Sequence, residues 1–345
     1  LEDEIVRIAR ERGLRLWGPN TQGVAYAANR LSAVFWPVIR TTGPLAVVGQ
    51  SGTVVAAISD WALGEGLGLS ASFSLGNQAD VCEAEVLRFL RDDDLTRSVA
   101  LYLEGTRDGE RLVSAVADVA LDLPIAVLKC GRTELGREAV ASHTGSLAGS
   151  DRVYSGFCRQ YGLVRAGDSE SLYDAAKILA TMRLPKGNRV LMMSSSGGSC
   201  ALAADEADAQ GLVLPVPSAE YVEGLKRLGV PEWGSFANPL DIGGISLDHF
   251  REAARMADAE DLADVILLVF GDPIEGADKL ACDLAATSRA AVCAAIYGGA
   301  AVETEQRWTM QRSGVPVFPT PERAMRAIGA CCWYARWRDR KVARA

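Results

Sequence analysis

Histidine is scarce in this sequence, whose 345 residues contain only His143 and His249. None of the eight cysteines forms a C-x-x-C pair, and most of them stand among apolar residues. A zinc site needs closely spaced cysteine and histidine ligands, and scattered thiols are typical of reduced core residues. The sequence therefore predicts no disulfide frame and no metal site, and we expect the protein in the cytoplasm.

Long apolar runs and an excess of positive charge are also missing. No run reaches the roughly 18 apolar residues of a membrane-spanning helix, so we predict no membrane partner. Lysine and arginine number 36 against 44 aspartates and glutamates, a net charge of −8. This balance argues against nucleic acid or an anionic membrane surface as the main partner. With 49% hydrophobic residues, the chain has the composition of a globular protein of two or three domains.

The first 40 residues are typical of the end of an α/β unit. Residues 1–13 predict an amphipathic helix, and residues 14–18 (LRLWG) predict a short strand before Pro-Asn-Thr-Gln-Gly. The chain begins with leucine instead of methionine, so we expect further residues upstream.

Strand-like and helix-like runs alternate twice along the rest of the chain. The first series fills residues 41–186, and the second fills residues 187–345 after a turn cluster at Pro185. Such alternation predicts parallel sheets covered by helices on both faces. We therefore expect an α/β protein with two doubly wound domains.

Each of these two domains opens with a strand, a turn of small residues and a helix. The turns contain Gln50, Ser51, Gly52 and Thr53 in the first domain, and Ser195, Ser196, Gly197 and Gly198 in the second. Backbone N–H groups at the positive end of a helix dipole can hold a phosphate. One such turn alone is more often an ordinary N-cap. Two of them suggest a phosphate held by both helices.

A glycine-rich stretch from Lys129 to Asp151 contains His143. Glycine tolerates unusual backbone angles, so this stretch suits a mobile loop whose imidazole acts at two places. Glu104 ends an earlier strand-like run, LYLEG, and could hold one imidazole nitrogen while the other acts as a nucleophile. An incidental surface histidine and a capping glutamate are the plain alternatives.

Eight segments occur in the order seen in the NDP-forming acyl-CoA synthetases, which are relatives of the succinyl-CoA ligase alpha chain: GPNTQG, VGQSGTV, SLGNQADV, LYLEG, GREAVASHTGSLAGSD, SSSGG, NPLDIGG and FPTPERA. The chain resembles this family over essentially its whole length. The resemblance implies two flavodoxin-like domains, preceded in residues 1–40 by the remnant of a Rossmann-like CoA-binding domain.

The same resemblance implies a reaction and a site. Acyl-CoA, phosphate and NDP are interconverted with carboxylic acid, CoA and NTP through an acyl phosphate and a phosphohistidine. His143 is then the phosphohistidine, Glu104 orients it, and both turns hold phosphate. The implied candidates for substrate binding are Asn20, Asn77, Asn238 and Asp241.

The family also implies ligands and partners. CoA is a substrate, and ATP or ADP binds with Mg²⁺ to ATP-grasp domains that this sequence lacks. We expect those beta-type domains on a separate chain or a missing segment, a small carboxylic acid as substrate, and an oligomer. Acetate, a branched acid and an aromatic acid all fit, as do ADP and GDP.

Two other functions fit parts of the sequence. Gly49-Gln-Ser51-Gly-Thr53 begins like the nucleophile elbow of a serine hydrolase, and Asp80 and His143 follow in the α/β-hydrolase order. Thr53, however, stands where that motif needs glycine. The second alternative is a regulatory module that binds acyl-CoA or phosphate without turnover.

Overall fold

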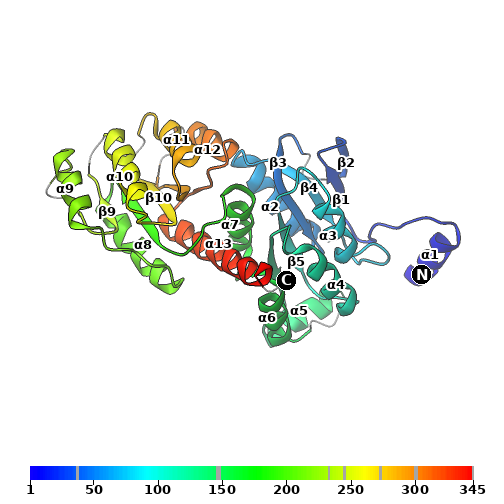
Figure 1. Cartoon of the computed structure of the whole chain (residues 1–345). Coiled ribbons are helices and arrows are strands. Elements are labelled where there is room, and N and C mark those ends of the chain that lie inside the picture. The colour runs from blue at the N-terminus through cyan, green and yellow to red at the C-terminus, as the bar shows by residue number, and fades with distance from the viewer. Residues whose placement is uncertain are drawn as a thin grey trace. The chain divides into compact units, whose positions relative to one another are not determined.

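The computed structural model describes residues 1–35, 39–144, 149–231, 234–243, 246–271, 274–298 and 302–343. The chain forms two compact units, unit 1 (Leu1–Ala180) and unit 2 (Thr181–Ala345) (Figure 1). The domain boundary drawn from the sequence, after residue 186, lies a few residues beyond this division.

Unit 1 contains a seven-stranded sheet in the order β2-β1-β4-β3-β5-β6-β7. Its strands are β1 (Gly23–Tyr26), β2 (Leu31–Val34), β3 (Thr42–Gly49), β4 (Leu69–Ser74), β5 (Ser98–Leu103), β6 (Ile125–Lys129) and β7 (Val164–Arg165). From β3 to β7 all pairings are parallel, and the order of these five strands is the flavodoxin-like order 2-1-3-4-5.

Two strands within residues 23–34 extend this sheet. β1 pairs antiparallel with β4, and β2 pairs antiparallel with β1. Residues 14–18, predicted as a strand, form no regular structure, so that prediction was wrong. The segment is held instead by side chains, because Arg15 bonds Asp80 at 2.8 Å and the Trp17 indole donates to the Ser74 carbonyl oxygen at 2.6 Å.

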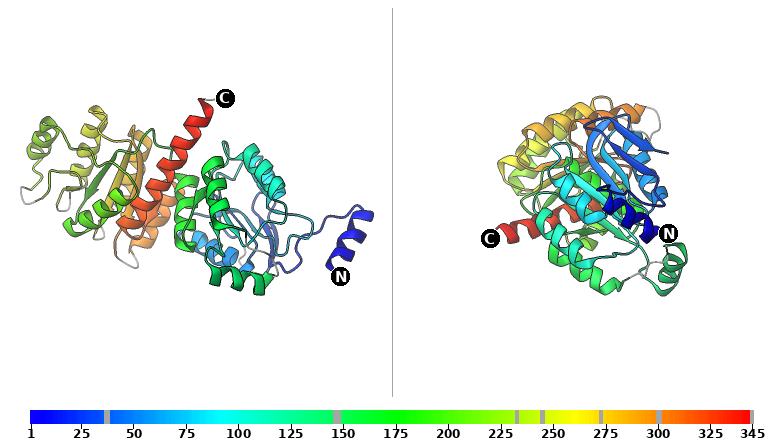
Figure 2. Two further views of the ribbon diagram at one scale, coloured as in Figure 1. Left: turned by 90° about the horizontal axis from the view of Figure 1, so that it is seen from below. Right: turned by 90° about the vertical axis from the view of Figure 1, so that its right-hand side faces the viewer.

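Helices cover the sheet of unit 1 on both faces (Figures 1 and 2). They are α2 (Gly52–Gly64), α3 (Glu83–Arg91), α4 (Gly109–Val119), α5 (Glu134–Thr144), α6 (Asp151–Tyr161) and α7 (Ser169–Thr181). Several of these helices begin at side-chain caps; for example, Ser51 accepts from the Val54 N–H and Asp108 from the Arg111 N–H. The first helix, α1 (Glu2–Glu11), lies apart from the sheet, and its Glu2 side chain contacts Asn77 and Arg107 (Figure 1).

Unit 2 repeats the architecture with five parallel strands in the order β12-β11-β10-β8-β9. Its strands are β8 (Val190–Ser194), β9 (Leu240–Asp241), β10 (Val265–Phe270), β11 (Ala291–Ile296) and β12 (Val317–Phe318), and its helices are α8 (Gly197–Ala209), α9 (Ala219–Arg227), α10 (Leu247–Ala259), α11 (Ala277–Thr287), α12 (Val302–Arg312) and α13 (Pro321–Val342). Counted within the unit, this is again the order 2-1-3-4-5. The prediction of two flavodoxin-like α/β parts is confirmed.

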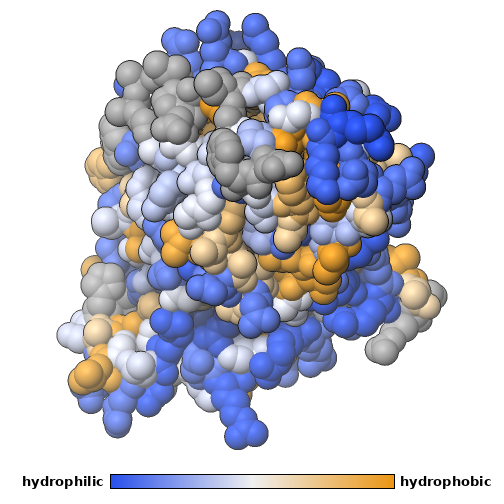
Figure 3. Space-filling model, turned by 90° about the vertical axis from the view of Figure 1, so that its left-hand side faces the viewer, coloured by the Kyte–Doolittle hydropathy of each residue, from blue (hydrophilic) through white to orange (hydrophobic). Residues whose placement is uncertain are grey.

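The strands supply the core of each unit. All six residues of β10 and all six of β11 are buried, as expected for a parallel sheet covered on both faces. Hydrophobic residues reach the surface in patches among hydrophilic ones (Figure 3). Among the described residues, no helix has both the length and the apolar character needed to cross a membrane.

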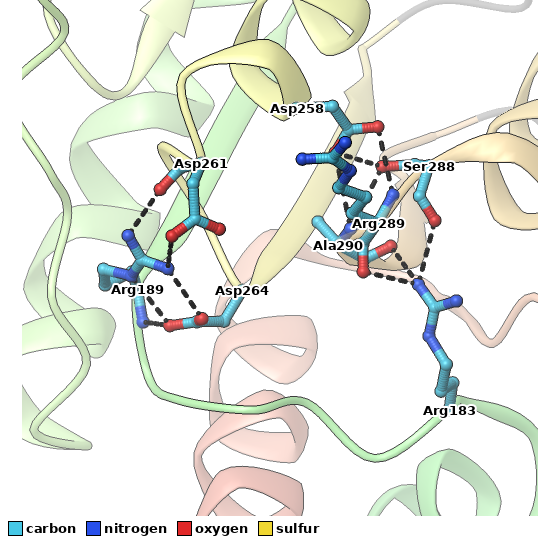
Figure 4. A network of polar contacts seen from close by, with 8 residues as sticks. All are labelled: Arg183, Arg189, Asp258, Asp261, Asp264, Ser288, Arg289 and Ala290. Atoms are coloured by element: carbon cyan, nitrogen blue, oxygen red, sulfur yellow. Dashed lines mark hydrogen bonds and ion pairs between the residues drawn. The ribbon is translucent and has the colours of Figure 1, made fainter.

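A polar network ties the amino ends of the strands of unit 2 (Figure 4). Arg189, just before β8, bonds the Asp264 carboxylate at 2.9 Å and Asp261 at 3.2 Å. Arg183 donates to the carbonyl oxygens of residues 288–290. Burial pushes the pKa of Asp264 upward, but its hydrogen bonds from Arg189 outweigh burial and leave that pKa lowered. These contacts at the amino ends of the strands therefore stabilise unit 2.

Candidate functional site

The residues of the candidate site lie at the carboxyl ends of the parallel strands. In a 2-1-3-4-5 sheet, ligands bind outside the carboxyl ends of the first and third strands, where the strand order reverses. In unit 1 these ends carry Gln50-Ser51-Gly52 after β3 and Glu104 after β5. In unit 2 they carry Ser195-Ser196-Gly197 after β8 and Gly271 after β10.

The side chain of Gln50 joins the two strand ends of unit 1. Its Oε1 accepts from the backbone N–H groups of Glu104 and Gly105, the latter at 3.1 Å. Its Nε2 donates to the Gly105 carbonyl oxygen and to Gln78 Oε1, both at 2.8 Å. Both amide hydrogens are engaged and the oxygen accepts twice. The contacts therefore favour a positioning role for this side chain over the phosphate contact expected from the sequence.

Glu104 is a buried carboxylate, with 5% of its surface exposed. The Tyr102 hydroxyl donates to Glu104 Oε1 at 3.4 Å. A tyrosine phenol is protonated at neutral pH, and burial raises the pKa of Tyr102 further above its usual range. The sequence analysis missed Tyr102, although residues two apart in a strand share a face.

His143 lies in the last turn of α5. Its side chain and residues 145–148 lie outside the described part of the structure, so the pairing of His143 with Glu104 stays a prediction. The sequence suggested a loop throughout this stretch, whereas residues 134–144 are helical. Good helix formers such as leucine, glutamate and alanine between the glycines explain the helix.

The ends of the His143 stretch are anchored. Lys129, which is buried, donates to the Cys130 carbonyl oxygen and lies 5.0 Å from the centre of the Tyr154 ring. The Tyr154 hydroxyl bonds Thr106 at 2.7 Å. Burial lowers the pKa of Lys129. These contacts fix the points where the stretch leaves β6 and enters α6.

The turn after β3 brings the backbone of α2 close to the segment before β1. Ser51 caps α2, and Thr53 is exposed. A Cβ atom at Gly52 would lie 2.4 Å from Cγ of Gln22, so only glycine fits here without a shift of that side chain. Gln22, which the sequence analysis passed over within GPNTQG, thus faces the positive end of α2.

The turn after β8 is closed differently. Ser195 Oγ accepts from the Gly271 N–H at 3.1 Å. A Cβ atom at Gly197 would lie 2.9 Å from Asp241 Oδ2, whereas one at Gly198 would meet nothing within 4 Å. The other oxygen of Asp241 accepts from the Gly243 N–H at 3.1 Å. A carboxylate therefore faces the positive end of α8, which stabilises the helix and opposes a second anion.

Asn20 and Asn77, two predicted substrate residues, lie together. Asn20 Nδ2 donates to Asn77 Oδ1 at 3.3 Å, and Asn77 Nδ2 donates to Glu2 at 3.1 Å. A pocket next to this pair includes Glu2 and is otherwise lined by apolar residues, namely Ile5, Val6, Leu16, Trp17, Pro19 and Ala79.

Asn238, a third predicted substrate residue, is engaged by backbone. Its Oδ1 accepts from the Met192 N–H at 3.1 Å, and its Nδ2 donates to the carbonyl oxygens of Val190 at 2.8 Å and Pro215 at 3.2 Å. These contacts hold the loop before β9 against β8. They favour a structural role for Asn238.

The serine-hydrolase alternative finds no support in the geometry. Its acid, Asp80, is bonded by Arg15 and accepts from the Leu16 N–H at 2.9 Å. Its nucleophile, Ser51, accepts a hydrogen bond from the α2 backbone as the helix cap. Among the residues the structure describes, no group of three or more His, Cys, Asp or Glu could hold a metal ion.

Comparisons with known proteins agree with this architecture. Residues 42–179 match the succinyl-CoA ligase like flavodoxin domain. The chain is 36% identical to the alpha subunit of acetate–CoA ligase (ADP-forming) I from Pyrococcus furiosus, over 98% of this chain and 74% of that subunit. It is 34% identical to acetate–CoA ligase (ADP-forming) I from Archaeoglobus fulgidus, of which it spans 48%.

A solved structure is similar over nearly the same extent. The dinucleotide forming acetyl-coenzyme A synthetase 1 of Ca. Korarchaeum cryptofilum, in complex with phosphate and ADP, has a TM-score of 0.89 and 32% identity. The match covers 99% of this chain and 75% of that one. Together with the flavodoxin-like order of both sheets, these similarities show that the chain belongs to the ADP-forming acyl-CoA ligases, a family of acid–thiol ligases, and corresponds to their alpha-type part.

Proposed function

We propose that this chain carries the phosphohistidine step of an ADP-forming acyl-CoA ligase, with His143 as the phosphorylated residue and Glu104 as its positioning carboxylate. The observation that supports this most is the setting of Glu104. It is buried at the switch point of unit 1, its backbone is bonded by Gln50 and its side chain by Tyr102. A carboxylate held in this way can fix the orientation of an imidazole.

The reaction proceeds by two displacements before the nucleotide is used. A phosphate oxygen attacks the thioester carbonyl, the C–S bond breaks, and CoA leaves with an acyl phosphate remaining. A nitrogen of His143 then attacks phosphorus, the bond from phosphorus to the acyl oxygen breaks, and the acid leaves. Phosphoryl transfer of this kind depends mainly on positioning and on neutralising charge, which the α2 N–H groups behind Ser51, Gly52 and Thr53 can provide.

The remaining ligands are assigned by chemistry. The amide side chains of Asn20 and Asn77 can donate to a carboxylate, so we assign the acid to this pair, and CoA and the nucleotide to the complete enzyme. The nucleotide and its Mg²⁺ belong to ATP-grasp domains beyond this chain, which receive the phosphoryl group from His143, and the complete enzyme is an oligomer. In unit 2, Ser195, Ser196, Gly197 and Gly198 form a second candidate turn for phosphate, whose affinity for an anion the Asp241 carboxylate lowers.

The test uses acetyl phosphate, which delivers a phosphoryl group without CoA or nucleotide. The chain is incubated with acetyl [³²P]phosphate and assayed for acid-labile, base-stable label. We expect label on the wild type and on His143→Gln only at background. His249→Ala, which changes the other histidine, should label like the wild type. Equal label on the His143 variant would exclude this residue as the acceptor, and an unlabelled wild type that still binds phosphate would favour the regulatory module.

A further inference from the structure

A series of hydrogen-bonded side chains, of which Glu83 and Gln78 are buried and Gln50 is half-buried, runs from the start of α3 to the backbone of Glu104. Glu83 and Gln78 have 2% and 4% of their surfaces exposed. Gln78 Nε2 donates to Glu83 Oε2 at 2.5 Å, and Gln78 Oε1 accepts from Gln50 Nε2 at 2.8 Å. The far end of Gln50 accepts from the N–H groups of Glu104 and Gly105.

The Glu83 carboxylate fixes which way the amide groups of Gln78 and Gln50 point. An ionised glutamate only accepts hydrogen bonds, so Gln78 must turn its NH₂ group toward Glu83 and its oxygen toward Gln50. Gln50 must then turn its own NH₂ group toward Gln78, which leaves its oxygen for the backbone of Glu104. If the amide group of Gln78 were turned by 180°, its NH₂ group would face the NH₂ group of Gln50. Gln50 would then no longer be held with its oxygen on the backbone N–H of Glu104.

We infer that Glu83 is a positioning residue for phosphoryl transfer, acting through Gln78 and Gln50 to fix the backbone of Glu104. The inference rests on the proposed function, because it assumes that Glu104 orients the imidazole. It adds two residues, Glu83 and Gln78, that contact no reacting atom. In a buried network, each satisfied hydrogen bond strengthens the orientation of the next.

A purely structural role for Glu83 makes a different prediction. Glu83 is the first residue of α3, where a carboxylate also interacts favourably with the helix dipole. Burial raises the pKa of Glu83, which means that its charge is unfavourable where it lies. Replacing such a carboxylate by an apolar side chain of similar volume is often neutral or stabilising. If Glu83 has only a structural role, replacing it by an apolar residue should leave the rate of His143 labelling unchanged. If it acts through Gln78 and Gln50, the same replacement should slow labelling without lowering the melting temperature.

The experiment compares Glu83→Met with Glu83→Gln by acetyl [³²P]phosphate labelling, thermal unfolding and phosphate calorimetry. Methionine removes the acceptor, and we expect labelling about tenfold slower, with a melting temperature no lower than that of the wild type. Glutamine keeps an acceptor oxygen and should restore the rate to within about threefold of the wild type. Phosphate affinity should not change. Glu110→Gln, an exposed glutamate in the first turn of α4, is the matched control.

The outcomes separate this inference from the proposed function. A slow but stable Met variant and a faster Gln variant would support the positioning role. A Met variant that labels as fast as the wild type would overturn the inference alone, and so would equal slowing in both variants. A wild type that takes no label would overturn the proposed function, and the inference with it.

Discussion

The two units share one strand order and one kind of turn, yet the groups that face the turns differ in charge. In unit 1 the neutral amide side chain of Gln22 lies against Gly52, at the positive end of α2. In unit 2 the carboxylate of Asp241 lies against Gly197, at the positive end of α8. A helix end facing an amide can still attract an anion, whereas one facing a carboxylate is already partly neutralised. The fold thus provides the location, and the neighbouring loop decides the charge.

The two units also differ at the ends of β5 and β10, the third strand of each parallel sheet. The residue after β5 is Glu104, and the residue after β10 is Gly271. Gln50 crosses to the first with a side chain that reaches a further buried network. Ser195 crosses to the second with one hydrogen bond to the backbone. Among the described residues, the third strand of unit 1 is thus followed directly by a carboxylate and that of unit 2 by a glycine, and the predictions below test that difference.

The largest effect is expected from Glu104→Gln, which removes the charge from the switch point of unit 1 and keeps its shape. A charge-assisted hydrogen bond is about twice as strong as a neutral one, and a loss of about 1.4 kcal/mol slows the reaction tenfold. We therefore expect acetyl phosphate to label the variant at least about tenfold more slowly, with a nearly unchanged melting temperature. Unchanged labelling kinetics would return Glu104 to a structural role.

A smaller effect is expected from Asp241→Asn, which makes the α8 turn resemble the α2 turn in charge. Removing a carboxylate from a helix N-terminus changes the energy of a competing anion by about 0.3–1 kcal/mol. Phosphate should therefore bind the variant about two- to fivefold more tightly in calorimetry. Asp248→Asn, an exposed acid on α10, is the control. Weaker binding by the Asp241 variant would mean that this carboxylate helps to hold the ligand.

The smallest effect on labelling, none, is expected from Asp264→Asn at the opposite edge of unit 2. The folded-state pKa of Asp264 is lowered, so its stabilising contribution is present above the unfolded pKa and is lost as pH falls through the folded pKa. The variant should lose about 1–2 kcal/mol at pH 7, since Arg189 is partly exposed, and the difference should shrink toward pH 3. Thermal unfolding across pH measures this. A constant difference from pH 7 to pH 3 would contradict the ionic role.

The alternation of apolar runs was enough to predict two doubly wound sheets, because a buried parallel strand must be apolar along its length. The same signal failed at residues 14–18, where apolar residues led to the prediction of a strand. That segment is held by the Arg15 and Trp17 side chains, which contact residues more than 50 positions away. The alternation also did not predict that β1 and β2 extend the first sheet, since strands of only four residues each are too short for a clear alternation.

The sequence by itself determined the fold class and the positions of the two glycine-containing turns, because each depends on local periodicity or on residues adjacent in the chain. Only the tertiary structure decided what those residues face. Gln50 looked like a phosphate contact until its oxygen was found on a backbone N–H 54 positions away. Asp241 was expected only as a substrate contact, and the pairing of β8 with β9 brings its carboxylate to Gly197. The charge at a site depends on all residues that are close in space, and the order of residues along the chain does not show which ones these are.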